Sequence, residues 1–270
     1  MNLASNEIWY TNGSTIEATN PTNIDAFGAD IISNQYSIEN RCWIITFANN
    51  ISTIGPSAFI NCLNLTAIKL PDSIKSIEYE AFGWCDNLIQ VITGDGIIKI
   101  GNFAFRSCKK LRSISLGSNL ISIGDYAFYY CRQLNKVSIP QAVINIGKKA
   151  FKYCYKLSQI DIGFNVRIIG EEAFCECLNL TNIIIPYSVG IIESKAFYCC
   201  PISSVQCMPQ IPPLCFPEDN EHWNLFFNND TDFKIYVQTD SLEIYKTSEP
   251  WNIYAGHIIG HDFRKKGIIR

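Results

Sequence analysis

Several features that mark common classes of protein are missing from this 270-residue sequence. Charged residues make up only 17% of the chain and hydrophobic residues 47%, which excludes intrinsic disorder. No apolar run approaches the roughly 20 residues that a membrane-spanning helix needs. The net charge of −3 predicts no general affinity for nucleic acid. Residues 1–6 lack the basic and apolar stretches of a secretory signal, which indicates either a cytosolic protein or a processed or trimmed form.

Patterns that carry catalysis or bind metals are also scarce. The chain has three histidines, His222, His257 and His261, and no H-E-x-x-H motif. The pair His257 and His261 spans Gly260, which weakens a helix there, so packing in a cap is favoured over a zinc site or a catalytic dyad. The sequence also lacks G-x-S-x-G, a P-loop and a Rossmann glycine pattern. We therefore expect no enzyme, no metal and no cofactor.

A 23-residue repeat dominates the sequence instead. The dipeptide Ala-Phe recurs seven times without an insertion, with its phenylalanines at Phe59, Phe82, Phe105, Phe128, Phe151, Phe174 and Phe197. A cysteine follows each phenylalanine by three residues, at Cys62, Cys85, Cys108, Cys131, Cys154, Cys177 and Cys200. An isoleucine precedes each phenylalanine by five residues, and a leucine follows the first six cysteines by three. A constant period indicates that each unit is one coil of a solenoid.

The pattern within one unit predicts its local structure. Segments such as Leu111–Leu116 alternate apolar and polar residues and are followed by proline or glycine, which is typical of a short strand with one buried face. Strands that return after every 23 residues must be parallel and lie about 4.8 Å apart. The Ala-Phe segment fits a short helical turn. We expect an α/β repeat solenoid with a parallel sheet on one face.

The repeat resembles the BspA-like bacterial branch of the leucine-rich repeat family. That branch has units similar to I-x-x-I-G-x-x-A-F-x-x-C-x-x-L-x-x-I-x-I-P, and residues 121–140 match this pattern closely. The resemblance covers residues 51–207, and Glu78 and Glu193 replace its glycine. It implies a right-handed leucine-rich repeat solenoid in a secreted or cell-surface bacterial protein that attaches to host proteins, host cells or other bacteria.

Both ends of the chain are expected to cap the solenoid, since its end coils would otherwise expose their core. Residues 1–50 should form a cap with a hairpin that pairs Glu7–Tyr10 with Thr15–Glu17, followed by a faded repeat over 31–50. Residues 51–207 hold the seven repeats. Residues 208–270 should form a second cap with a strand at 233–237, a helix at 240–246 and a frayed tail.

Twelve cysteines are too many for an ordinary enzyme of this size. Seven of them recur in register, so we expect a column of small buried thiols rather than a metal site or a disulfide framework. Cys42 should lie in the core, whereas Cys175 and Cys199 fall in variable columns that we expect at the surface. Cys207 and Cys215 are close enough in sequence to pair, and the sequence leaves that open.

The charges suggest a binding surface. Residues 97–166 carry eleven basic side chains and two acidic ones, whereas both flanking regions are acidic. The candidate patch joins basic residues to tyrosines in neighbouring coils: Arg106, Lys109, Lys110, Arg112, Tyr129, Tyr130, Arg132, Lys136, Lys152, Tyr153, Tyr155 and Lys156. Coulomb attraction and aromatic stacking would let it hold a sulfated glycan or an acidic protein segment. A solvated face that only balances the acidic ends is the alternative.

Taken together, these patterns predict a non-catalytic recognition or adhesion module with a protein or an acidic glycan as its partner. Variable side chains on the outer face of the sheet would be displayed on a rigid scaffold, which lowers the ordering cost of binding. A structural spacer whose faces bind nothing specific is the second hypothesis. A contiguous exposed apolar or aromatic patch would favour the binding module. Nothing in the sequence indicates the oligomeric state or the mode of anchoring.

Overall fold

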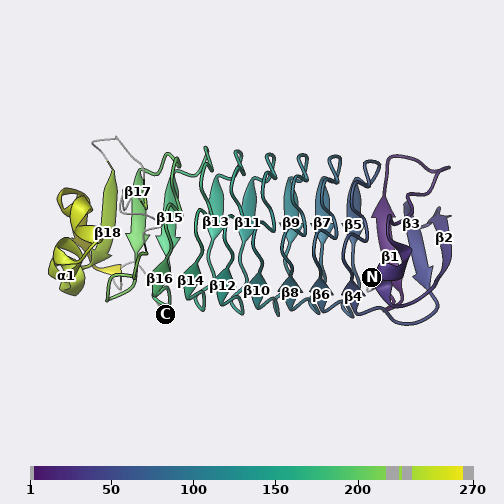
Figure 1. The fold of residues 1–270 in the computed structure, drawn as a ribbon, viewed down its shortest axis with the longest axis horizontal. Coiled ribbons are helices and arrows are strands. Elements are labelled where there is room, and N and C mark those ends of the chain that lie inside the picture. The colour runs from purple at the N-terminus through teal and green to yellow at the C-terminus, as the bar shows by residue number, and fades with distance from the viewer. Residues whose placement is uncertain (1–2, 217–224, 227–232, 264–270) are drawn as a thin grey trace.

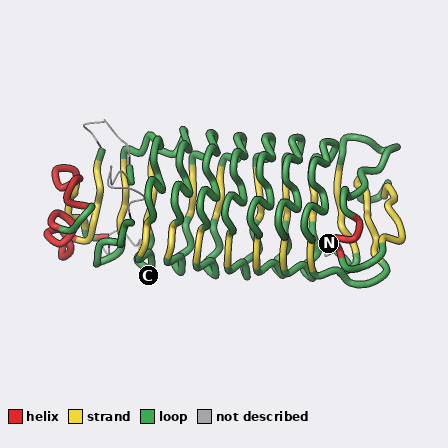
Figure 2. Tube along the Cα trace, in the orientation of Figure 1, coloured by secondary structure: helices red, strands yellow, loops and turns green. Residues whose placement is uncertain are grey.

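The chain folds into a straight, elongated solenoid of stacked coils (Figures 1 and 2). We describe a computed structural model, in which residues 3–216, 225–226 and 233–263 are placed well enough to describe. We number the seven coils by their Ala-Phe dipeptides, from coil 1 at Ala58-Phe59 to coil 7 at Ala196-Phe197. The predicted tail at 264–270 and His222 lie outside the described residues.

Each coil contributes strands to two sides of the solenoid. The first side holds β5 (Ala67–Lys69), β7 (Gln90–Ile92), β9 (Ser113–Ser115), β11 (Lys136–Ser138), β13 (Gln159–Asp161), β15 (Asn182–Ile185) and β17 (Ser204–Cys207). The second side is one seven-stranded parallel sheet of β4 (Thr53–Ile54), β6 (Ser76–Ile77), β8 (Lys99–Ile100), β10 (Ser122–Ile123), β12 (Asn145–Ile146), β14 (Ile168–Ile169) and β16 (Ile191–Ile192). Residues 23 apart pair in register, for example Val91 with Ile114, which confirms the predicted parallel stacking.

A continuous column of phenylalanine rings fills the core. The seven repeat phenylalanines are buried and stack nearly parallel, with ring centroids 5.0–5.4 Å apart. Phe27 packs edge-on against Phe59 at one end, and Phe226 stacks on Phe197 at 5.5 Å at the other. The repeat isoleucines and leucines surround the column, so the solenoid has one uninterrupted hydrophobic core.

The Ala-Phe segments form tight turns rather than the predicted helical turns. In every coil two non-glycine residues have left-handed backbone angles, one before the alanine and one before the cysteine, as at Tyr126 (φ 56°) and Tyr130 (φ 65°). Such residues interrupt a helix. Alternate turn amides donate to carbonyls of the next coil, for example Phe128 N to Ala150 O at 2.7 Å, and the amides between them donate to the carbonyl three residues earlier, for example Tyr129 N to Tyr126 O at 3.1 Å. Each turn is therefore held by hydrogen bonds both within its own coil and to the next one.

The cysteine column is buried as predicted, and it also makes hydrogen bonds that the sequence did not reveal. From coil 2 to coil 7 each thiol donates to the phenylalanine carbonyl of the preceding coil, at Sγ–O distances of 2.9–3.3 Å. Cys131, for example, donates to Phe105 O at 3.1 Å. A thiol is small enough for this site and also supplies a donor, which neither alanine nor valine can do.

The N-terminal cap differs from the predicted hairpin. Strand β1 (Glu7–Thr11) pairs antiparallel with β3 (Cys42–Phe47) on one side and β5 on the other, and Thr15–Glu17 forms no strand. The amide of Glu17 donates to Ser14 Oγ, and Asn12 donates to Glu17 O, so this segment turns back on itself. The region expected to be a faded repeat is an antiparallel hairpin of β2 (Ile31–Ser37) and β3. The 3₁₀ helix at Ile24–Phe27 delivers the Phe27 ring.

The C-terminal cap continues the parallel sheet. Strand β18 (Lys234–Gln238) pairs with β17, and β19 (Ile258–His261) pairs with β18. A 3₁₀ helix at Thr239–Ser241, the helix α1 (Leu242–Thr247) and a 3₁₀ helix at Trp251–His257 connect these two strands. Trp251 and Tyr245 are buried and pack edge to face at 5.2 Å, which closes the core at this end.

Glycine at the bend before the Ala-Phe turn, present in five of the seven coils, permits close contact between coils. A Cβ on Gly147 would lie 2.5 Å from the carbonyl carbon of Gly124, whereas a Cβ on Gly190 would meet nothing within 4 Å. We expect Gly147→Ala to lower the free energy of unfolding by at least about 2 kcal/mol because backbone must move. Gly190→Ala should change it by less than about 1 kcal/mol. Urea denaturation of both variants measures this, and equal losses would contradict the stacking geometry.

The buried thiols make stability depend on alkaline pH. Burial raises the pKa of Cys131 and Cys154, so these thiols stay neutral in the folded chain at pH values where they ionise in the unfolded chain. Their contribution to stability is complete below about pH 8.5 and is lost as the pH rises, by about 1.4 kcal/mol per pH unit for each thiol. Urea denaturation in reductant between pH 7.5 and 10 should show a shallower decline for Cys131→Ala/Cys154→Ala than for the parent. Equal slopes would contradict this assignment.

Candidate binding surface

The twelve residues of the predicted patch lie in coils 3 to 5. They occupy the stretch of each coil that runs from the Ala-Phe turn to the start of the next strand, so equivalent positions stack across neighbouring coils. Backbone hydrogen bonds fix this stacking, as Tyr130 N donates to Lys152 O at 2.9 Å and Lys156 N to Arg132 O at 3.2 Å. Lys136 differs from the others because it lies on strand β11, on the outer face of the sheet.

Acidic side chains from adjacent coils neutralise most of the basic residues. Seven of the eleven basic side chains in 97–166 form ion pairs with a carboxylate one coil away: Lys99, Arg106, Lys109, Lys136, Lys148, Lys149 and Lys152. Lys109, for example, lies 2.7 Å from Asp86. Burial alone would lower the pKa of Lys152, but its hydrogen bond with Glu172 and its Coulomb interactions with Cys175, Glu172 and Tyr153 together outweigh that effect and raise the pKa. The excess of positive charge counted along the sequence is therefore largely balanced in space.

Four basic side chains remain without a carboxylate partner in the described part of the chain. Lys110, Arg112 and Lys156 are exposed, and Lys110 donates only to the neutral Asn87, at 2.7 Å. Arg132 lies with its guanidinium 4.1 Å from the centre of the Tyr130 ring and donates to the Tyr130 hydroxyl. Its Nε is buried without a hydrogen-bond partner. These four residues span coils 3 to 5 and are the cations of 97–166 that no described carboxylate pairs with.

Four tyrosines lie next to these cations and contact one another. Tyr129, Tyr130, Tyr153 and Tyr155 form a chain of ring contacts with centroid distances of 5.3–6.2 Å. Burial raises the pKa of Tyr129 and Tyr155, and a neighbouring tyrosine raises each further, so both hydroxyls stay protonated at neutral pH. We call the eight residues together the cation–tyrosine surface: Lys110, Arg112, Tyr129, Tyr130, Arg132, Tyr153, Tyr155 and Lys156.

An exposed apolar stripe on the second sheet was missed from the sequence. Ile98, Ile121 and Ile144 occupy one outward column and are 40–43% exposed, and Leu214 at the far end is 60% exposed. Exposed Arg167 occupies this column in coil 6 and interrupts the stripe, which resumes one column over at partly exposed Ile168 and Ile191, and Ile191 bridges to Leu214. The sequence contained a signal for this stripe, because the column is polar in coils 1 and 2, at Ser52 and Lys75, and changes to isoleucine in coils 3 to 5.

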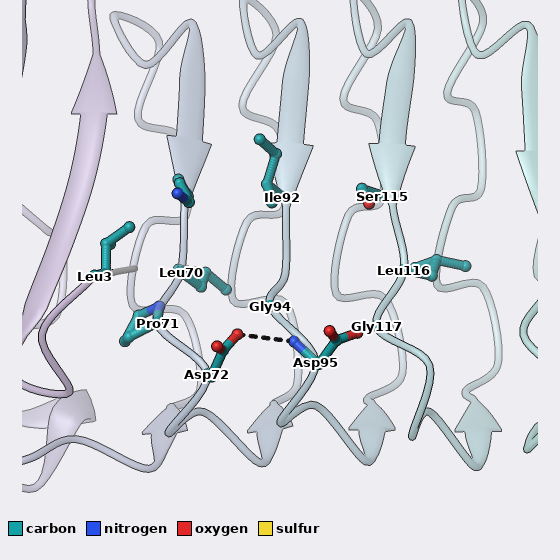
Figure 3. Close-up of a pocket in the computed structure, with 11 residues that line it drawn as sticks. Leu3, Leu70, Pro71, Asp72, Ile92, Gly94, Asp95, Ser115, Leu116 and Gly117 are labelled. Carbon is teal, nitrogen blue, oxygen red and sulfur yellow. Dashed lines mark hydrogen bonds between the residues drawn. The ribbon is translucent and has the colours of Figure 1, made fainter. Parts of the chain in front are cut away.

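A shallow pocket of about 240 Å³ lies where the strands β5, β7 and β9 end (Figure 3). The carboxylates of Asp72 and Asp95 lie beside it. Asp72 Oδ1 accepts a hydrogen bond from Asp95 N at 3.0 Å, and Asp95 Oδ1 accepts one from Ser118 N at 3.0 Å. Both carboxylates therefore hold adjacent turns together. The lining contains no histidine or cysteine, and no group of side chains converges on a reacting atom.

The cysteines outside the column correct one expectation. Cys175, expected at the surface, is only 3% exposed, because the turn that carries it is tightly packed against coil 5, where Tyr153 N donates to its carbonyl. Cys199 is partly exposed, and Cys42 is buried as predicted. Cys207 and Cys215 are free thiols, and the Cys207 thiol lies 3.4 Å from the Tyr245 hydroxyl. Within the described residues no group of histidine, cysteine and acidic side chains could hold a metal ion.

Comparisons with known proteins place the chain in a family. Residues 29–158 and 144–236 match the profile of the BspA type Leucine rich repeat region, with six copies of the repeat. The chain therefore belongs to the BspA-type leucine-rich repeat family, and the fold predicted from its residues is confirmed. In the part of the chain that can be described, no helix has the length and apolar character needed to cross a membrane. No curated protein is significantly similar to the chain.

Solved structures share this fold. A Leucine Rich Repeat protein of T. pallidum is 28% identical, with a TM-score of 0.50, over 52% of this chain and 68% of that protein. A leucine-rich repeat protein from Eubacterium ventriosum is 20% identical, with a TM-score of 0.50, over 68% of this chain and 45% of that one. A leucine rich cell surface protein from Faecalibacterium prausnitzii is 23% identical, with a TM-score of 0.40, over 58% of this chain and 52% of that one. Membership of the leucine-rich repeat family supports the assignment as a repeat interaction module.

The accessibility of the cysteines can be tested chemically. We expect iodoacetamide at pH 8 to modify Cys199 in the folded chain well before Cys175, because only the Cys199 thiol reaches solvent. Mass spectrometry of tryptic peptides would measure both rates. In urea without reductant, all twelve thiols should react. Protection of Cys207 and Cys215 in urea would show a disulfide that the structure lacks.

Proposed function

We propose that this chain is a non-catalytic adhesion module at a bacterial surface, or in a secreted protein, and that it binds an acidic partner on a host or bacterial surface. The observation that carries the proposal is the cation–tyrosine surface, where four basic side chains lack the carboxylate partner that the other seven have. The proposed location rests on the family to which the chain belongs. A secreted or surface-exposed protein would meet acidic glycans and acidic protein segments there.

The arrangement suits binding of an anion in three respects. The stacked coils hold Lys110 and Lys156 in one column two coils apart, so their backbone positions are fixed about 10 Å from each other. Arg132 lies between them in coil 4 and is already oriented by Tyr130, which reduces the entropy lost on binding. The neighbouring tyrosines lower the local exposure to water, and this strengthens Coulomb attraction.

A spacer that binds nothing specific is the weaker hypothesis. A spacer would be expected to carry solvated polar side chains on all its faces, as coils 1 and 2 do at Ser52 and Lys75. Coils 3 to 5 instead expose the contiguous isoleucine column of Ile98, Ile121 and Ile144 in addition to the cation–tyrosine surface. Contiguous exposed patches of this kind mark interaction sites.

Retention on heparin–agarose tests the proposed anion site. We expect the variant Lys110→Gln/Arg112→Gln/Arg132→Gln/Lys156→Gln to elute at a clearly lower NaCl concentration than the parent, because it removes the four cations of coils 3 to 5 that have no ion pair. The matched control Lys99→Gln/Lys109→Gln/Lys136→Gln/Lys148→Gln changes the net charge equally but removes only paired cations. It should elute close to the parent. Equal shifts for both variants, or no retention of the parent, would contradict the proposal.

A further inference from the structure

The tyrosine hydroxyls of the cation–tyrosine surface are available to a ligand. In the described part of the chain the hydroxyls of Tyr129, Tyr153 and Tyr155 have no hydrogen-bond partner, and only the Tyr130 hydroxyl accepts one, from Arg132. All four rings are partly exposed, and each contacts at least two of the others. The surface therefore offers protonated phenol groups, each of which can both donate and accept hydrogen bonds. Contacts among the four rings hold these groups in place.

The backbone at the same surface is already occupied. The amides of Tyr129, Tyr130 and Tyr153 donate to carbonyls of Tyr126, Lys152 and Cys175, at 2.9–3.1 Å. A peptide that docks as an added strand needs a row of free amides and carbonyls. Recognition at this surface has to use side chains, namely phenol rings, phenol hydroxyls and the four cations.

These groups match the chemistry of an acidic sugar polymer. A sugar ring presents apolar C–H faces that pack on aromatic rings, and hydroxyls that exchange hydrogen bonds with phenols. Sulfate or carboxylate groups on the sugar would pair with Arg132 and with Lys110 or Lys156. An acidic peptide would satisfy the cations, and its carboxylates could accept hydrogen bonds from the phenols, but its acidic side chains offer no ring face to pack on the four tyrosines.

We infer that the acidic partner of the cation–tyrosine surface is a polysaccharide that carries sulfate or carboxylate groups, with its sugar rings on the four tyrosines and its acidic groups on Arg132, Lys110 and Lys156. This inference rests on the proposed function and narrows the partner to one chemical class. The polymer would run along the solenoid axis, since the cations and the tyrosines both repeat from coil to coil in that direction.

Two soluble probes distinguish recognition of sugar rings from recognition of negative charge alone: a heparin octasaccharide and a poly-L-glutamate of similar total charge. Their Kd values would be measured by isothermal titration calorimetry at 50 and 150 mM NaCl. The test variant is Tyr129→Phe/Tyr153→Phe/Tyr155→Phe, which removes three hydroxyls and keeps the rings and all charges. The control is Tyr79→Phe/Tyr187→Phe, which removes hydroxyls from exposed tyrosines elsewhere. Circular dichroism melting would verify that both variants fold.

The inference predicts that the parent binds the octasaccharide more tightly than poly-L-glutamate. The test variant should weaken octasaccharide binding about tenfold or more, from the loss of hydrogen bonds, and weaken poly-L-glutamate binding by a clearly smaller factor. The control variant should change neither. If both probes bind and the test variant binds the octasaccharide as the parent does, or if poly-L-glutamate binds more tightly, the sugar inference is overturned and the anion site stands. If neither probe binds, the proposed function fails as well.

Discussion

The structure depends on the register between successive coils. Every coil hydrogen-bonds to the next through its strands and through its Ala-Phe turn, where Phe128 N reaches Ala150 O. This register stacks the phenylalanine rings, lets each thiol reach the preceding phenylalanine carbonyl, and brings the backbones into contact at glycines such as Gly147. Because a solenoid is stabilised by contacts between neighbours, one shifted coil would disturb the core on both sides.

The same register decides where the charges lie. A partner 20 to 26 residues away in sequence is a neighbour in space, as in the pairs of Arg106 with Glu80 and Lys152 with Glu172. Counting charges along the chain therefore overstated the basic character of coils 3 to 5. Among the eleven basic side chains of 97–166, Lys110, Arg112, Arg132 and Lys156 are the four without an ion pair to a described carboxylate, and this makes them the candidates for an outside anion.

Features that repeat in every coil could be predicted from the sequence, whereas features found in only one place, such as the N-terminal loop, could not. The family, the parallel solenoid and the buried thiol column followed from residues repeated at a fixed spacing. The hydrogen bond that each thiol donates could not be predicted, because a repeated cysteine is equally consistent with a thiol that only packs and with one that also donates. The hairpin around Asn12-Gly13 was wrong because side-chain hydrogen bonds of Asn12 and Ser14 fold that loop, which leaves β1 to pair with β3 and β5. Phe226 continues the ring column outside the 23-residue period. The binding assignment of the twelve candidate residues stays a prediction.

The central claim is that one small region of a rigid solenoid receives an acidic partner. The most direct test is an amide NMR titration of the isotope-labelled chain with a heparin octasaccharide. The account predicts shifts confined to coils 3 to 5, largest between Lys110 and Lys156, with the core and both caps unmoved. Shifts centred on the apolar stripe from Ile98 to Leu214 or on a cap, or no shifts at millimolar ligand, would contradict it.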